Sequence, residues 1–285
     1  MRYSQAQPIG SEINIPALEK RHKEGLAYVI QGEGPPVILV HGIAASLYDW
    51  TNIMPALAHA GYRSYALDLP GHGESDKPDD PDQYHVDILQ SRLSHWINSL
   101  SISKPFLLLG HSLGGYLSLV YADLHPEQVR GMVLIDPFYT PEQLSPLLRI
   151  ARHKPELGAK TMRMVPEWLI NTLLGWDPIS TAEFTPEVRK QIANDYKRAS
   201  PHFVRITSEI PDITSILPTI TVPTRVIWGE RDLTLKPDSF PRLVDLLPNA
   251  EAAPIHSSGH QPHIGKPELV AQMVLEFAAT LPPVD

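Results

Sequence analysis

The sequence has 285 residues, of which 42% are hydrophobic and 20% charged, a composition that excludes an intrinsically disordered chain. Its formal net charge of −8, with no cluster of lysine and arginine, disfavours nucleic acid and anionic membranes as partners. The absence of cysteine excludes disulfides, thiolate catalysis and cysteine-ligated zinc.

Neither a targeting segment nor a membrane span is predicted. The first 25 residues carry several charged side chains and lack the apolar centre of a signal peptide. No apolar run reaches the roughly 18 residues that a transmembrane helix needs. We therefore expect a soluble, cytoplasmic protein.

The first half of the chain alternates between short apolar runs and helical patterns. Strands are predicted at residues 26–30, 37–40, 62–67, 106–109 and 132–135, and helices at 48–60, 84–100 and 116–122. This alternation predicts a mostly parallel, doubly wound α/β sheet. Ligands bind beyond the carboxyl ends of such strands, which is where the sequence places His41, Asp68, Ser112 and Asp136.

The alternation stops at about residue 138 and resumes at about residue 223. The interval is rich in proline and contains helical stretches but no clear strand. We therefore predict a core domain of residues 1–137 and 223–285, and a helical cap, or lid, of residues 138–222. Most of the larger apolar side chains of the cap are expected to pack between cap and core: Met162, Met164, Trp168, Leu169, Leu173, Leu174 and Trp176.

After the cap the αβ pattern continues to the end of the chain. Strands are predicted at residues 224–228 and 252–255, and helices at 239–247 and 267–281.

A Gly-x-Ser-x-Gly motif, with Ser112 at its centre, joins a predicted strand to a predicted helix. A serine on so sharp a turn occupies a strained backbone conformation, and the flanking glycines prevent clashes. A serine hydroxyl becomes a nucleophile when a base accepts its proton and an acid orients that base. The order Ser112, then acids at strand ends, then His260 in a late loop agrees with such a triad.

Five segments together resemble the α/β-hydrolase-fold serine hydrolases, in particular the group of esterases, non-haem haloperoxidases and carbon–carbon bond hydrolases. The segments are His41-Gly42, Asp68–Ser75, Gly110–Gly115, Gly229–Asp232 and Gly259–Pro262. They occur in the order that the resemblance requires.

The resemblance implies an α/β-hydrolase fold with a Ser112–His260–Asp232 triad. The backbone N–H groups of Ile43 and Leu113 would form the oxyanion hole, because such donors must face the developing charge. Asp136 remains the alternative triad acid.

Other residues near these motifs are either alternatives to the catalytic base or structural supports. His256 and His263 are the alternative bases, but neither follows a glycine as the resemblance requires. His41 is expected to brace the oxyanion loop, and Asp68 and His72 to hold their own loop together. The histidines show no metal-ligand spacing, so no metal or other cofactor is expected.

The sequence departs from the resemblance at Gly265, where related proteins often carry glutamate. We expect this change to loosen a local hydrogen bond without touching the triad.

The predicted function is that of a carboxylic ester hydrolase acting through an acyl-enzyme on small short- to medium-chain or aromatic esters, as a monomer or homodimer. A perhydrolase, lactonase, thioesterase or carbon–carbon bond hydrolase would use the same triad. A ligand receptor on this fold is the alternative of another class. Related epoxide hydrolases and haloalkane dehalogenases use aspartate as nucleophile, so Ser112 argues against both. His111, where carbon–carbon bond hydrolases usually have asparagine, lowers that interpretation.

Overall fold

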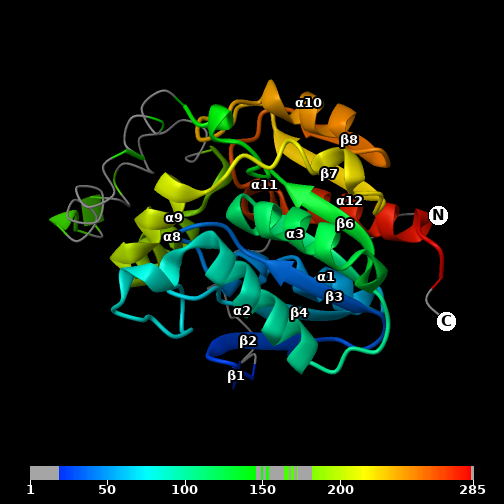
Figure 1. The fold of residues 1–285 in the computed structure, drawn as a ribbon, viewed down its shortest axis with the longest axis horizontal. Helices are drawn as coiled ribbons and strands as arrows, with labels where there is room; N and C mark the ends of the chain where they lie inside the picture. The colour runs from blue at the N-terminus through cyan, green and yellow to red at the C-terminus, as the bar shows by residue number, and fades with distance from the viewer. Residues whose placement is uncertain are drawn as a thin grey trace.

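A computed structural model describes residues 19–145 and 182–283, with residues 149, 152, 153, 164–166, 168, 169 and 172 between them. Figure 1 shows one twisted sheet with helices on both of its faces. The sheet has eight strands: β1 (Arg21–Lys23), β2 (Leu26–Gln31), β3 (Pro36–Val40), β4 (Arg63–Leu67), β5 (Phe106–His111), β6 (Val129–Ile135), β7 (Thr224–Gly229) and β8 (Ala250–Ile255).

The strands lie in the order β1-β2-β4-β3-β5-β6-β7-β8. The β1–β2 and β2–β4 pairs are antiparallel, and the pairs from β4 through β8 are parallel. The carboxyl ends of the parallel strands therefore meet at one edge of the sheet. The predicted mostly parallel sheet is confirmed.

The helices with their bounds are α1 (Met54–His59), α2 (Val86–Ser99), α3 (Leu113–Leu124), α8 (Pro186–Arg198), α9 (Val204–Glu209), α10 (Ser239–Leu246), α11 (Pro262–Gly265) and α12 (Pro267–Thr280). Short 3-10 helices are η1 (Leu47–Trp50), η2 (Pro81–Tyr84), η3 (Pro126–Gln128), η4 (Pro141–Gln143), η5 (Pro201–Phe203) and η6 (Leu217–Thr219). The predicted helix at 48–60 is thus two pieces, η1 and α1.

Both faces of the central strands are buried, which explains why their sequences are apolar without alternation. In β5, Phe106 and Leu108 join one hydrophobic cluster, and Leu107 and Leu109 join the cluster on the opposite face. The helices α2, α3 and α10 contribute to the first cluster, and α1 and α12 to the second. Successive side chains of a strand point to opposite faces, so a single apolar run serves both layers.

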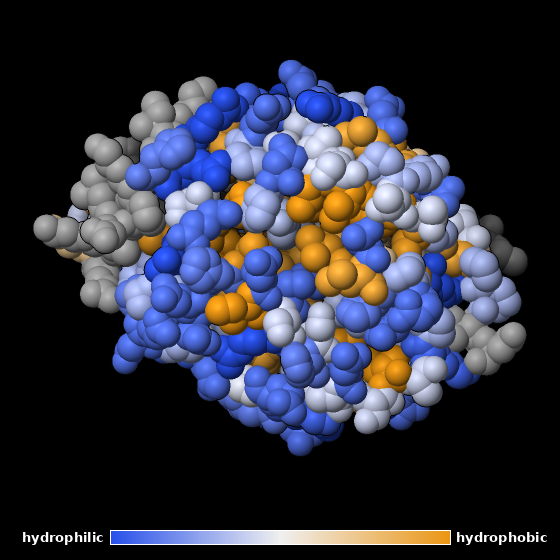
Figure 2. Space-filling view, viewed as in Figure 1, coloured by the Kyte–Doolittle hydropathy of each residue, from blue (hydrophilic) through white to orange (hydrophobic). Residues whose placement is uncertain are grey.

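The surface of the helix layer is largely polar. Hydrophobic residues gather near the middle of the face seen in Figure 2, where Figure 1 places α3, and polar residues surround them. None of the described helices is both long and apolar enough to cross a membrane.

Strand β1 was not predicted from the sequence. Its residues Arg21, His22 and Lys23 are polar and exposed, so no burial pattern marks the strand. It pairs with β2 through a turn at Glu24 and Gly25, both of which have positive φ. At the opposite edge of the sheet, β8 contains Pro254, which has no backbone N–H to donate.

Between β6 and β7, the part of the chain that the structure describes contains helices and no strand. Helices α8 and α9 lie together at one end of the molecule (Figure 1, left). Two expectations for this segment are wrong, because Met164 and Trp168 are 72% and 67% exposed rather than packed against the core. Leu169 is half-buried, and the other four predicted core residues (Met162, Leu173, Leu174 and Trp176) lie outside the described residues.

Candidate active site

Ser112 occupies the sharp turn between β5 and α3, where its backbone has φ 51° and ψ −112°. A positive φ is strained for a residue with a side chain. Glycines make this turn possible: a Cβ at Gly110 would lie 2.4 Å from the Gly114 carbonyl oxygen, and one at Gly114 would lie 2.1 Å from that of Val40. The predicted nucleophile elbow is therefore present in the geometry of the backbone.

The loop that follows β3 lies directly against Ser112. A Cβ added to Gly42 would be 2.7 Å from His111 Nδ1 and 3.2 Å from Ser112 Cβ, so a glycine favours this close approach. Ile43 is the next residue in the loop, and Leu113 is the first residue of α3. The first N–H groups of a helix have no partner within the helix. Leu113 thus adjoins the serine directly, and Ile43 follows the glycine that packs against it.

His41 holds this loop in place through both of its ring nitrogens. Its Nε2 accepts a hydrogen bond from the Leu69 N–H at 2.9 Å, so its Nδ1 carries the proton and donates to the Gly42 carbonyl at 2.6 Å. Burial lowers the pKa of His41 to about 4, which keeps the ring neutral and the Nε2 lone pair available. The bracing role predicted for His41 agrees with these contacts.

Asp68 fastens the adjacent loop after β4. Its two carboxylate oxygens accept from the backbone N–H groups of Leu47 at 2.7 Å and Glu74 at 2.8 Å. His72 donates from Nδ1 to the Pro70 carbonyl at 3.0 Å, and burial lowers its pKa to about 3. Both side chains hold backbone together, as predicted for them.

His260 and Asp232 form a direct hydrogen bond, with 2.7 Å between His260 Nδ1 and Asp232 Oδ2. The Asp232 side chain is fully buried, whereas His260 is 18% exposed. The other carboxylate oxygen of Asp232 accepts from the N–H groups of Thr234 at 2.7 Å and Leu235 at 2.9 Å. These two donors fix the carboxylate and leave Oδ2 for the imidazole, which orients Nε2 away from Asp232.

Asp136, the alternative acid, follows β6 and lies beside this pair. Its Oδ1 accepts from the Gly229 N–H at 3.0 Å, and its Oδ2 has no hydrogen-bond partner. Burial and the neighbouring Asp232 charge raise its pKa well above the ordinary value. The His260 hydrogen bond goes to Asp232 and not to Asp136.

His111 connects the serine turn to the histidine loop. Its Nε2 is 2.8 Å from the His260 carbonyl oxygen, and because a carbonyl only accepts, Nε2 must carry the proton. The two imidazole rings lie 4.9 Å apart between centroids. Ser112 and His260 are therefore joined through the residue that precedes the serine.

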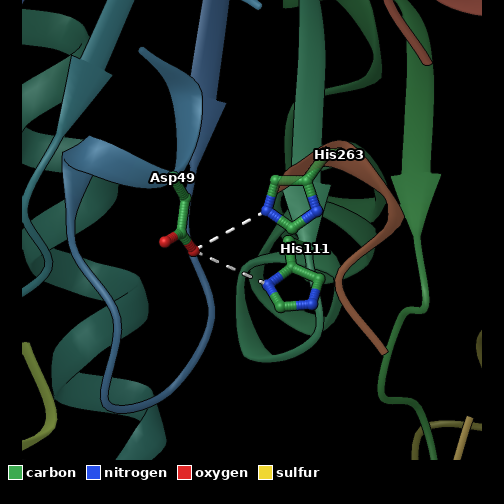
Figure 3. A group of neighbouring side chains, drawn as sticks. All are labelled: Asp49, His111 and His263. Atoms are coloured by element: carbon green, nitrogen blue, oxygen red, sulfur yellow. Dashed lines mark ion pairs between the residues drawn. The ribbon is translucent and has the colours of Figure 1, made fainter. Parts of the chain in front are cut away.

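His111 also belongs to a buried cluster with Asp49 and His263 (Figure 3). Asp49 Oδ2 is 4.0 Å from His111 Nδ1 and 3.7 Å from His263 Nε2, and none of these atoms has a hydrogen-bond partner. Burial, followed by the charge of Asp68, raises the pKa of Asp49 to about 8. Burial lowers the pKa of His263 to about 3 and that of His111 well below its usual value. At neutral pH all three groups are uncharged.

Among the described residues, two groups have metal-ligand atoms within 4.8 Å of one another. One is Asp136, Asp232 and His260, and the other is this cluster. Ligands on a tetrahedral zinc, about 2.0–2.2 Å from the metal, are about 3.4 Å apart. The two Asp49 separations exceed that value, and a carboxyl that holds a proton at neutral pH is a weak ligand. The arrangement fits an uncharged polar network better than a metal centre.

The alternative bases lie elsewhere. His256 is exposed and pairs with Glu230 at 2.8 Å on the surface. His263 is fully buried in the cluster with Asp49.

Glu183 occupies the space beside Gly265. A Cβ at Gly265 would lie 2.9 Å from Glu183 Cβ and 3.2 Å from Glu183 Oε2. The same Oε2 accepts a hydrogen bond from the Gly259 N–H at 3.2 Å, one residue before His260. The sequence analysis expected a loosened hydrogen bond at Gly265, and the structure places a carboxylate from another segment in that space.

Comparison with known proteins agrees with this geometry. The family described as the alpha/beta hydrolase fold matches residues 35–267. The chain belongs to the α/β-hydrolase family. A solved structure similar to this α/β hydrolase is a thermophilic esterase from Thermogutta terrifontis, 26% identical, with a TM-score of 0.77 over 90% of this chain and 93% of that one.

Curated relatives of this α/β hydrolase carry different activities. It is 24% identical to Lipase 1 of Psychrobacter immobilis, over 89% of this chain and 80% of that protein. It is also 25% identical to bifunctional epoxide hydrolase 2 of Rattus norvegicus, over 90% of this chain. The chain spans about half the length of that epoxide hydrolase, 53% of it. Relatedness therefore shows a hydrolase fold and leaves the substrate to be argued from the site.

Two features of this α/β hydrolase were missed by sequence reasoning. The Asp49–His111–His263 cluster joins three distant segments, and Asp49 was not singled out because a lone acid before tryptophan carries no signal. Glu183 was missed because a lone acid likewise carries no signal. Gly265 was the available clue, since a missing side chain in a buried loop leaves room for another.

Proposed function

We propose that this α/β hydrolase cleaves carboxylic esters through an acyl-enzyme on Ser112. The observation that carries the proposal is the 2.7 Å hydrogen bond between His260 Nδ1 and Asp232 Oδ2, which directs the imidazole Nε2 outward from a buried carboxylate. A serine in the strained elbow conformation supplies the matching nucleophile.

In the proposed reaction Ser112 Oγ attacks the carbonyl carbon of the ester while His260 Nε2 takes the hydroxyl proton. The carbonyl oxygen becomes an oxyanion that accepts hydrogen bonds from the N–H groups of Ile43 and Leu113. His260 then gives the proton to the leaving alcohol as the C–O bond breaks. Water, deprotonated by His260, attacks the acyl-enzyme, and the acid leaves as Ser112 regains its proton.

Asp232 has the role of orienting acid in this scheme. Its hydrogen bond fixes the tautomer of His260 and stabilises the imidazolium that forms in each step. Asp136 is disfavoured for this role because its Oδ1 accepts from the Gly229 N–H and the His260 hydrogen bond goes to Asp232.

The resemblance to epoxide hydrolases does not extend to the nucleophile. Ser112 stands where those enzymes use aspartate, so epoxide opening is disfavoured. The 26% identical esterase and the 24% identical lipase support an ester substrate. A perhydrolase, lactonase, thioesterase or carbon–carbon bond hydrolase with the same triad remains a candidate that a substrate panel would separate.

We assign residues 138–222 as the cap that selects the acyl group. Ser200, which precedes η5 between α8 and α9, contacts a loop of the core: its N–H donates to the Gly71 carbonyl at 2.7 Å. We expect small esters with short- to medium-length or aromatic acyl groups, no cofactor, and a cytoplasmic location.

The test is hydrolysis of p-nitrophenyl esters from acetate to decanoate by the wild type and Ser112→Ala. Loss of a nucleophile that acts as part of a unit should lower kcat by about 10⁶-fold. Circular dichroism and the thermal midpoint check that the variant folds. A wild type inert towards every ester, or an S112A variant that keeps its activity, contradicts the proposal and shifts attention to carbon–carbon bond substrates or a receptor role.

A further inference from the structure

We propose that Glu183 is a positioning residue that holds the catalytic histidine loop, acting from the cap segment in the space that Gly265 leaves. The inference rests on the proposed function, because it concerns how His260 is kept in place for ester hydrolysis. It assigns a role in that reaction to a residue from outside the core of the fold.

The Glu183 carboxylate is buried against the loop, with 5% of its side chain exposed. Its Oε2 accepts from the Gly259 N–H at 3.2 Å. Burying a carboxylate is costly unless hydrogen bonds and charges compensate, so this side chain is committed to the loop rather than to solvent.

Lys266 completes the contact from the other side of the loop. Its Nζ is 3.8 Å from Glu183 Oε1 and donates to the His256 carbonyl at 2.8 Å and the Ser257 carbonyl at 3.3 Å. The loop contains Ser257 with φ 57°, a strained conformation that must be held by its surroundings. Glu183 and Lys266 together restrain the backbone from residue 256 to residue 259.

Three anchors therefore fix His260. Asp232 holds its ring and His111 holds its carbonyl, and Glu183 holds the N–H of the preceding residue. The first two anchors come from the core. The third comes from the segment between β6 and β7, so the position of the base depends on how that segment is seated. A displacement of about 1 Å at a catalytic group can lower the rate by about 10²-fold.

Because Gly265 has no side chain, the arrangement can be tested by exchanging the residues at positions 183 and 265. The two positions compete for one space, since a Cβ at Gly265 would be 2.9 Å from Glu183 Cβ. Moving the glutamate from one position to the other, in the double variant E183G/G265E, removes the Cβ at 183 and supplies a carboxylate from 265. E183G leaves no carboxylate in this space, and G265E places two there.

We would measure kcat and KM on the best p-nitrophenyl ester for the wild type, E183G, E183Q, G265E and E183G/G265E. E183G should lower kcat about tenfold or more with little change in KM, because the base is displaced while the acyl pocket persists. E183Q keeps a carbonyl oxygen for the Gly259 N–H and should stay within about threefold of the wild type. The exchange variant should recover most of the lost kcat, because it supplies a carboxylate to the same space from residue 265.

The matched control is Glu209→Gly. Glu209 lies in the same expected cap segment and is ion-paired with His85 at 2.6 Å and Arg205 at 2.9 Å, but it touches no part of the histidine loop. Its substitution should leave kcat within about twofold of the wild type. An E183G variant with kcat within threefold of the wild type, or an exchange variant no more active than E183G, overturns the proposal. Should E183G not fold, recovery of folding and activity in the exchange variant decides in its favour, and failure decides against it.

Hydrogen exchange at the Gly259 amide separates this proposal from the proposed function. Loss of its acceptor should raise the exchange rate of that amide about tenfold or more in E183G, and the exchange variant should restore protection. A wild type that neither hydrolyses esters nor reacts with a fluorophosphonate contradicts the proposed function alone. Unchanged exchange at Gly259 in E183G contradicts the role of Glu183, whatever the enzyme's activity.

Discussion

Two groups of carboxylate and imidazole lie near His260, which is a member of one and is joined to the other through His111, and they differ in their hydrogen bonds. Asp232 receives two backbone N–H groups and contacts a partly exposed His260 at 2.7 Å. Asp49 receives no donor on Oδ2, and its two buried histidines lie 3.7 and 4.0 Å away. Aspartate and histidine thus form an orienting pair at Asp232 and His260 and a buried cluster without hydrogen bonds between its members at Asp49, because the two places differ in hydrogen-bond donors and in exposure to solvent.

Within these two groups, the largest expected effect comes from replacing the Asp232 carboxylate. Asp232→Asn should lower kcat/KM of the proposed esterase by about 10⁴-fold, since an amide favours the wrong tautomer of His260 and does not stabilise its imidazolium. Asp136→Asn is the matched control on the neighbouring strand. Asp136 makes no hydrogen bond to His260 and accepts from the Gly229 N–H, a bond that an amide oxygen can also accept, so kcat/KM should stay within about threefold. The reverse ranking would make Asp136 the triad acid.

The second effect concerns the pH dependence of stability at Asp49. Its pKa is about 8 in the folded protein and about 3.9 in the unfolded chain, so between these values unfolding releases a proton and the wild type loses stability as pH rises. Asp49→Asn removes this loss. The free energy of unfolding of D49N relative to the wild type should therefore increase from pH 5 to pH 7, by at most about 1.4 kcal/mol per unit.

Urea denaturation at each pH measures this difference, with D136N as a second buried acid expected to change in the same direction. A D49N difference independent of pH would show that Asp49 is ionised in the folded protein.

The smallest expected effect concerns the protonation state of His263, which NMR can detect. The pKa of His263 is lowered to about 3 by burial, against about 6.5 in the unfolded chain, so its contribution to stability is lost as pH falls from about 6.5 towards 3. Nitrogen-15 NMR at pH 5 should find His263 neutral, and His111 neutral with its proton on Nε2. The urea-unfolded protein, in which all histidines titrate normally, is the reference. A protonated His263 at pH 5 would mean that it forms a charged pair with Asp49.

The fold was largely predictable because its central strands are continuous apolar runs ending in turn residues. Leu107 and Leu108 face opposite clusters, and both had to be apolar. The exposed β1 was not predictable, because its three polar residues are held by hydrogen bonds to β2 rather than by burial. A sequence pattern records which side chains are buried and not which backbones are paired.

In the candidate site, the residues on the motifs were predictable and their supports were not. Ser112, His260 and Asp232 each lie in a motif whose neighbours are local in sequence. Glu183 reaches Gly259 from a separate segment, and its signal is the small size of Gly265. Contacts of this kind depend on how the segment between β6 and β7 is placed, which a single sequence does not encode locally.

The two edges of the sheet also limit how copies of this protein can associate. Strand β1 presents Arg21, His22 and Lys23 to solvent, and at the other edge β8 has Pro254 in place of a residue with an N–H. Positive charge and a missing donor both oppose the addition of a further strand. Growth of the sheet from one molecule into the next is thereby discouraged at both described edges, and so is the edge-to-edge pairing that begins aggregation.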